Sequence, residues 1–131
     1  MSFTLDVSKF VEKAKKNPEK VMRQVSIKLF SAIIKASPVD TGRFRMNWMA
    51  SGGIPASGTT DAVDKSGNIA IGNATSFVLK AADWRELTLT NNLPYAQRLE
   101  YGWSQQAPQG MVRANVSRFQ QLINEEANKV K

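Results

Sequence analysis

The chain contains no cysteine and no histidine among its 131 residues. Without cysteine no disulfide can support the fold, and an intracellular origin is the simpler expectation. Without histidine the chain lacks the commonest general base and the commonest metal ligand. No apolar run approaches the roughly 20 residues that span a bilayer, and residues 1–6 lack the basic and apolar regions of a signal peptide. We therefore expect a soluble protein with no membrane partner and no cofactor.

The length of the chain limits the number of domains, and its charge indicates the kind of partner it could bind. A chain of 131 residues corresponds to one domain, so we predict a single domain over residues 1–131. The net charge is +7, and residues 1–36 hold eight Lys or Arg against three Asp or Glu. Such an excess favours contact with nucleic acid or an acidic protein, although a solvated helix face is the simpler interpretation. Within it, Lys13, Lys15 and Lys16 could attract DNA only non-specifically, in a salt-sensitive way.

Helical periodicity is clearest over residues 18–36. Asn17 is placed to cap this helix, Pro18 suits its first position, and Ser37-Pro38 ends it. The expected apolar stripe comprises Met22, Val25, Leu29, Ala32, Ile33 and Ala36. Weaker patterns predict further helices over residues 8–16, 75–82 and about 108–128.

Alternation of apolar and polar residues predicts strands over Phe44–Ala50 and Glu86–Asn91. Residues 68–72 suggest a short strand or the end of a loop. Between these segments, residues 51–67 form a flexible loop rich in Gly, Ser and Thr, and a loop this long is functional or disordered when alone. We predict an α+β fold, with an antiparallel or mixed sheet of about three to four strands packed against a long N-terminal helix and a C-terminal helix.

The string Ser37–Arg45 contains a triplet, Asp40-Thr41-Gly42, that also occurs in aspartic proteases. In those enzymes the triplet follows an apolar strand, whereas here it follows a helix end and precedes Arg43. We interpret it as a turn in which Asp40 accepts backbone N–H groups and Gly42 takes a positive φ. Arg43 and Arg45 could contact phosphate or a partner carboxylate, and the simpler interpretation is pairing with Asp40 or protection of a strand edge.

The second unusual string runs from Asn91 to Ser104. Pro94 is expected to open a short helical turn, and Gly102 is expected to stop it. We expect Tyr95 and Leu99 to point into the core.

The end of this string combines charge with an aromatic residue. We expect Glu100 to form a local ion pair with Arg98. Trp103 precedes a polar loop, and aromatic residues with a polar tip are favoured at protein interfaces. Trp103 is therefore our leading interface residue. We find no phosphate-binding glycine loop, no metal-spaced acidic set and no nucleophile with a base partner, so we expect no enzymatic activity.

In order and spacing, the two strings resemble the neck and tail-completion proteins of long-tailed bacteriophages. In that family a long helix precedes a Pro-Val-Asp-Thr-Gly-Arg-like string, and a later strand ends in Thr-Asn before a Tyr-Ala step. The resemblance covers residues about 18–125, and 107–112 look like the family's entry into its last helix. The matching positions are Pro38, Val39, Asp40, Thr41, Gly42, Arg43, Thr90, Asn91, Tyr95, Ala96, Glu100 and Gly102.

The resemblance implies a structural virion protein at the head–tail junction, assembled in the host cytoplasm. Such proteins form rings around the DNA channel, with a hexamer as the leading expectation. The implied partners are further copies of the chain, the head connector or stopper, and tail tube or terminator proteins, with non-specific contact to genomic DNA. A tail terminator that caps the tail tube is the alternative, followed by a small basic DNA-binding protein. The expected partner-contacting residues are Gly52, Gly53, Ile54, Trp103, Ser104, Gln105 and Gln106.

Overall fold

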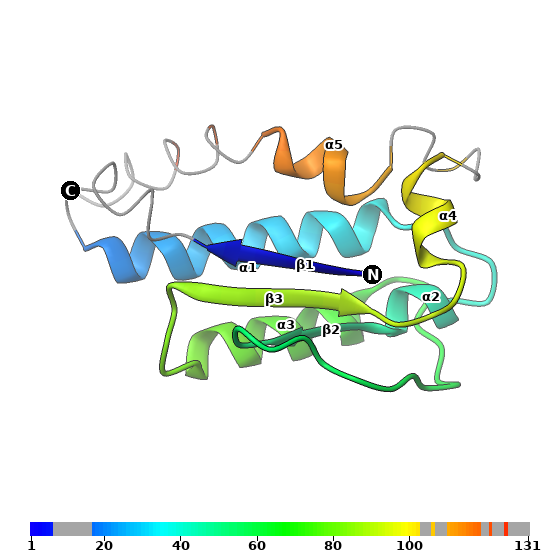
Figure 1. Cartoon of the computed structure of the whole chain (residues 1–131), viewed down its shortest axis with the longest axis horizontal. Helices are drawn as coiled ribbons and strands as arrows, with labels where there is room; N and C mark the ends of the chain where they lie inside the picture. Colours follow the sequence, from blue (N-terminus) through cyan, green and yellow to red (C-terminus); the bar gives the residue numbers. More distant parts are fainter. Residues whose placement is uncertain (7–16, 103–105, 107–109, 119–120, 122–124, 126–131) are drawn as a thin grey trace.

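The computed structural model describes residues 1–6, 17–102, 106, 110–118, 121 and 125. Helices and strands alternate irregularly along the chain, and the α+β class predicted from the sequence is confirmed (Figure 1). In chain order the elements are β1 (Ser2–Asp6), α1 (Pro18–Ala36), α2 (Arg43–Met46), β2 (Trp48–Ser51), α3 (Asn68–Lys80), β3 (Glu86–Asn91), α4 (Ala96–Glu100) and α5 (Val112–Val116).

The described sheet has the strand order β1-β3-β2, and both strand pairs are antiparallel. The predicted strand over residues 86–91 is confirmed as the central strand, whereas β1 has no counterpart among the predicted elements. Leu87 and Leu89 of β3 are two residues apart, so they share one face of the sheet, and both are fully buried. Helices α1 and α3 contact each other, and Figure 1 shows them lying behind the strands.

Helix α1 begins as its sequence predicts. The side chain of Asn17 accepts a hydrogen bond from the backbone N–H of Lys20 at 3.3 Å, and Pro18 opens the helix. The buried face is wider than the predicted stripe, because α3 and α5 both contact the helix and cover more of it. Ala32 and Ala36 are only half-buried. The buried residues are Val21, Met22, Val25, Ser26, Leu29, Phe30, Ile33 and Ile34.

The predicted strand over 44–50 is wrong in its first half, where the chain forms the single turn α2. Phe44 and Trp48 are both buried, and a spacing of four residues is also the spacing of one helix face. Their rings meet edge to face at 5.8 Å. Asn47 ends the turn by donating from its side chain to the carbonyl groups of Arg43 and Thr60. The alternating pattern therefore came from a turn followed by the shorter strand β2.

Residues 68–80 form one helix, α3, so the predicted strand or loop end at 68–72 is wrong and the predicted helix at 75–82 begins too late. Ala70, Ala74 and Val78 are its buried residues and recur at helical spacing. The helix has no side-chain cap at its own N-cap residue, Gly67. Instead the buried carboxylate of Asp64 accepts hydrogen bonds from the N–H groups of Gly67, Ile69 and Ala70 at 3.1, 2.9 and 3.0 Å.

Helices α1 and α3 are joined by a half-buried arginine. The guanidinium of Arg23 in α1 donates to the carbonyl oxygens of Val78 and Ala81 at the end of α3. A cation is favourable there because the last carbonyl groups of a helix carry partial negative charge. This contact fixes the start of α1 beside the end of α3.

At the C-terminal end the described residues contain the helix α5, within the helix predicted over about 108–128. Most of that predicted helix, and the predicted helix over 8–16, lie outside the described residues. None of the described helices has the length and apolar character needed to cross a membrane.

The carboxylate of Asp64 provides a test of how α3 is held. We expect Asp64→Ala to lower the free energy of unfolding by about 2–3 kcal/mol, because three N–H groups at the start of α3 lose a buried, charged acceptor. Urea denaturation measures the change. Asp61→Ala is the control: its carboxylate is exposed, so loss of its ion pair with Arg43 should lower the free energy of unfolding by less than about 1 kcal/mol. Equal midpoints for the two variants would contradict the proposed capping role.

Candidate functional site

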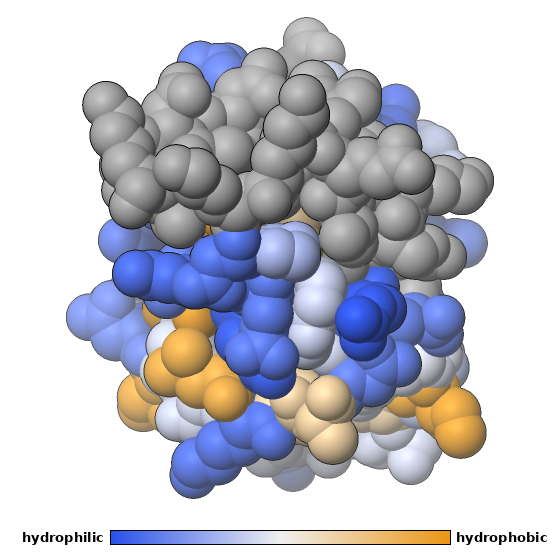
Figure 2. All heavy atoms as spheres, turned by 90° about the vertical axis from the view of Figure 1, so that its left-hand side faces the viewer, coloured by the Kyte–Doolittle hydropathy of each residue, from blue (hydrophilic) through white to orange (hydrophobic). Residues whose placement is uncertain are grey.

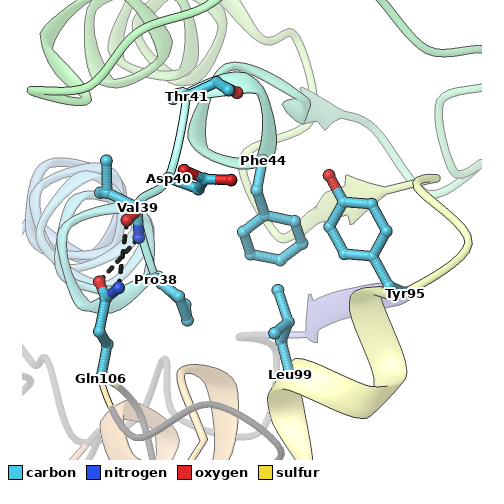
Figure 3. Close-up of a pocket in the computed structure, with 9 residues that line it drawn as sticks. Pro38, Val39, Asp40, Thr41, Phe44, Tyr95, Leu99 and Gln106 are labelled. Carbon is cyan, nitrogen blue, oxygen red and sulfur yellow. Dashed lines mark hydrogen bonds between the residues drawn. The ribbon is translucent and has the colours of Figure 1, made fainter.

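The two unusual strings of the sequence meet in space at one cavity of about 270 Å³ (Figure 3). The first string supplies the turn before α2 and Phe44, and the second supplies two side chains of the segment 95–99. We call this cavity the motif pocket. Its lining residues are Pro38, Val39, Asp40, Thr41, Gly42, Phe44, Tyr95, Leu99 and Gln106.

Aromatic rings form the inner wall of the motif pocket. Phe44 is buried and lies 5.8 Å from the ring of Tyr95, with the two rings tilted by 36°. Tyr95 remains 38% exposed, so the expectation that it points into the core is wrong. Ala96, the next residue, is the buried anchor of α4, and Leu99 is half-buried against the core. Tyr95 therefore lies at the rim, where a partner can reach it.

The turn of the first string is held by Thr41 rather than by Asp40. The hydroxyl of Thr41 accepts a hydrogen bond from the backbone N–H of Arg43 at 3.2 Å. The predicted positive φ of Gly42 is confirmed at 93°. The carboxylate of Asp40 is exposed and forms no hydrogen bond or ion pair with another described residue. The predicted Asx turn is therefore replaced by a threonine turn, and the carboxylate stays available to solvent.

Gly42 also lies against the segment that precedes α3. Its carbonyl oxygen accepts a hydrogen bond from the backbone N–H of Asp64 at 3.0 Å. A Cβ atom at position 42 would stand 2.5 Å from the backbone nitrogen of Lys65. This contact requires glycine, both for the space and for the positive φ.

Arg43 and Arg45 are used within the molecule. Arg43 donates through Nε to the carbonyl of Thr60 and forms an ion pair with Asp61 at 3.2 Å. Arg45 donates to three backbone carbonyl groups, two at the end of α1 and one at Lys65, at 2.7–3.1 Å. Neither arginine pairs with Asp40. Both guanidinium groups thus bind oxygens of the protein itself, and these contacts hold the turn against the long loop.

The loop over residues 51–67 is attached at several points. Asn92 donates to the carbonyl groups of Ala56 and Gly58, and the side chain of Asn47 accepts from the N–H of Thr60 at 2.9 Å. Its tip is exposed: Ile54, one of the expected interface residues, is 84% exposed, and Gly53 is exposed beside it. Gly52 is half-buried.

Glu100 has a different partner from the one expected. It is 4% exposed, and its carboxylate accepts hydrogen bonds from the backbone N–H groups of Met111, Val112 and Arg113 at 2.7–2.8 Å. The Arg113 side chain completes the contact at 3.1 Å. The predicted pair with Arg98 is thus replaced by a cap on α5. Anions are favourable at such helix starts.

The end of the second string also returns to the first. Gly102 has a φ of 88° just after α4, in agreement with its predicted role as a helix stop. The amide of Gln106 then accepts from the N–H of Val39 at 2.9 Å and donates to its carbonyl at 3.1 Å (Figure 3). Of the other expected contact residues, Trp103, Ser104 and Gln105 lie outside the described residues. The same holds for Lys13, Lys15 and Lys16.

A second hollow, of about 490 Å³, lies between β2, α3 and the long loop. Met49, Thr60 and Phe77 are among its lining residues, and it contains no charged side chain. The motif pocket differs because it presents one carboxylate beside aromatic rings. Among the described residues, no group of three or more acidic side chains is placed to hold a metal ion. An aspartic-protease dyad requires a second carboxylate beside Asp40, and no other lining residue of the motif pocket supplies one.

Comparison with protein-family models, with curated proteins and with solved structures finds no match for this chain.

Two glycines give opposite expectations for the same substitution. We expect Gly42→Ala to lower the free energy of unfolding by about 2 kcal/mol or more, since φ is positive and the added Cβ meets backbone. Gly72 lies within α3 with nothing near its added Cβ, so Gly72→Ala should raise stability by about 0.5–1 kcal/mol. Thermal or urea unfolding measures both. A neutral Gly42→Ala would contradict the close backbone contact.

Proposed function

We propose that the chain is a structural protein of the virion, located at the head–tail junction of a long-tailed bacteriophage. In this role it is a neck or tail-completion component, and it forms a ring that joins the tail to the head connector around the DNA channel. Assembly takes place in the host cytoplasm, and the role is one of binding rather than catalysis.

The observation that carries the proposal is the convergence of the two family-like strings. Pro38–Phe44 and Tyr95–Leu99 are separated by about 50 residues in the chain, yet they line one exposed pocket (Figure 3). Residues that only stabilise a core need no concave surface. A shared pocket with an exposed tyrosine and an unpaired carboxylate suits recognition of a protein partner.

A ring is consistent with the shape of the described domain. A ring interface is heterologous, so each copy must offer two different surfaces, and repeated rotation closes the assembly. The pocket is lined by residues of α2 and α4, two elements that lie at the same end of the molecule (Figure 1). The exposed tip of the long loop at Ile54 instead follows the end of β2. We propose a homo-oligomeric ring, with six subunits as the leading number, and with connector or stopper proteins and tube or terminator proteins as neighbours.

A tail terminator that caps the tail tube remains the nearest alternative, because it would present the same kind of ring. The location of the chain in a map of the virion separates the two roles.

A small basic DNA-binding protein is less well supported by the described arginines. Arg23, Arg43, Arg45 and Arg113 donate to carbonyl groups or carboxylates of the protein itself. Phosphate binding by Arg43 or Arg45 would compete with these internal contacts. A titration with duplex DNA at two salt concentrations tests this role, since non-specific binding has a steep salt dependence.

Electron microscopy of the purified protein tests the ring directly. We expect closed rings, six subunits in each, either alone or after addition of connector and tail tube components. Mass photometry at several concentrations provides an independent count of subunits. A chain that stays monomeric and binds neither component contradicts the proposal.

A further inference from the structure

The carboxylate of Asp40 is unusual among the acidic groups of this protein. Among the carboxylates whose side chains the structure describes, only Asp40 and Glu86 have no hydrogen bond or ion pair. Glu86 lies at the exposed start of β3, whereas Asp40 lines the motif pocket. An exposed carboxylate beside an apolar wall is a favourable site for a cation, since the charge is only partly screened there.

The remaining surfaces of the motif pocket suit a long side chain with a charged end. Pro38, Phe44 and Leu99 supply apolar contacts, and Figure 3 shows the Asp40 carboxylate and the Tyr95 hydroxyl on opposite sides of the Phe44 ring. Lysine and arginine combine an apolar stem with a cationic head, and both are attracted to aromatic faces. A cavity of about 270 Å³ is below the roughly 300–1,000 Å³ of typical small-molecule sites, so it fits one side chain better than a larger ligand.

We propose that the motif pocket binds a lysine or arginine side chain of a neighbouring copy of this chain, with Asp40 as its counterion. This inference rests on the ring proposed above. The chain carries 18 basic residues against 11 acidic ones, so each copy has basic groups in excess to offer. An ion pair between copies would use the carboxylate that has no partner within one copy.

A ring interface joins two different surfaces, so we look for the basic residue that the neighbouring copy donates at the end of the molecule opposite to the pocket. Arg23 holds the start of α1 beside the end of α3 there, and Lys20, Lys80 and Arg85 are exposed around them. Figure 2 looks onto this end and shows hydrophilic residues over its described surface, interrupted by separate apolar patches.

Arg85 is the strongest donor at this end. Its guanidinium carbon lies 4.4 Å from the centre of the Trp84 ring, and no described residue accepts a hydrogen bond from its side chain. Stacking holds the guanidinium in place, so less side-chain entropy is lost when it binds a carboxylate.

Charge removal at the two unpaired carboxylates tests the inference. We expect Asp40→Asn to raise the dissociation constant for self-association about tenfold or more, measured by sedimentation velocity. Glu86→Gln removes the same charge beside the proposed donor Arg85 instead of inside the pocket, and it should not raise this constant. Thermal unfolding should be the same for both variants, because neither carboxylate has an intramolecular partner.

A charge exchange sharpens the test. We expect Asp40→Arg and Arg85→Asp each to weaken assembly, and the chain carrying both changes to recover it, because each interface again joins one arginine to one aspartate. Failure of the double variant to recover overturns the pairing of these two residues. If the Asp40→Asn variant still forms rings as the wild type does, the pocket assignment is wrong and the ring proposal stands. If the wild-type chain is monomeric, the ring of the proposed function is wrong as well.

Small probes test the chemistry of the pocket apart from the ring. N-acetylarginine amide, added to the ¹⁵N-labelled Arg85→Asp variant, should shift the backbone amide signals of Thr41 and Gly42. The citrulline analogue has nearly the same shape without the charge and should shift them much less. Equal shifts from the two probes, or none from either, contradict a cation site.

Discussion

The motif pocket depends on the close approach of two backbone segments at Gly42. The carbonyl of Gly42 accepts from the N–H of Asp64, and the space beside its Cα leaves no room for a side chain. Asp64 in turn caps α3 with its buried carboxylate. One turn of chain thus connects the end of α1, the start of α3 and the wall of the pocket. Because interiors are tightly packed, a shift of this turn would move all three.

The polar groups around this turn either bind other groups of the protein or remain accessible to a partner. Arg45 and Glu100 belong to the first kind: Arg45 donates to three carbonyl groups, and Glu100 caps α5. Such contacts position the two strings without being exposed to a partner. Asp40 and Tyr95 differ, because they remain accessible at the rim of the same pocket. Some residues of the two strings therefore build the pocket, whereas Asp40 and Tyr95 remain accessible to a partner.

Local sequence patterns were sufficient to predict α1 and β3. The cap at Asn17 adjoins α1, and the alternation of residues 86–91 lies within β3 itself. Elements that depend on distant contacts were missed or misjudged. The cap of α3 comes from Asp64, outside the helix, and the partner of Glu100 is thirteen residues away at Arg113. The strand β1 pairs with β3 across 80 to 88 residues. For the same reason the sequence indicated two motifs but not that they share one pocket, since long-range contacts leave no periodic signal.

Hydrogen–deuterium exchange of the free and the assembled protein tests most directly whether the two strings form one recognition surface. Assembly should slow amide exchange in 38–44 and 95–99 together, while the exposed side of α3 around Asn73 and Ser76 keeps its rate. Protection of only one string, or of α3 with both strings unchanged, would contradict a shared docking pocket.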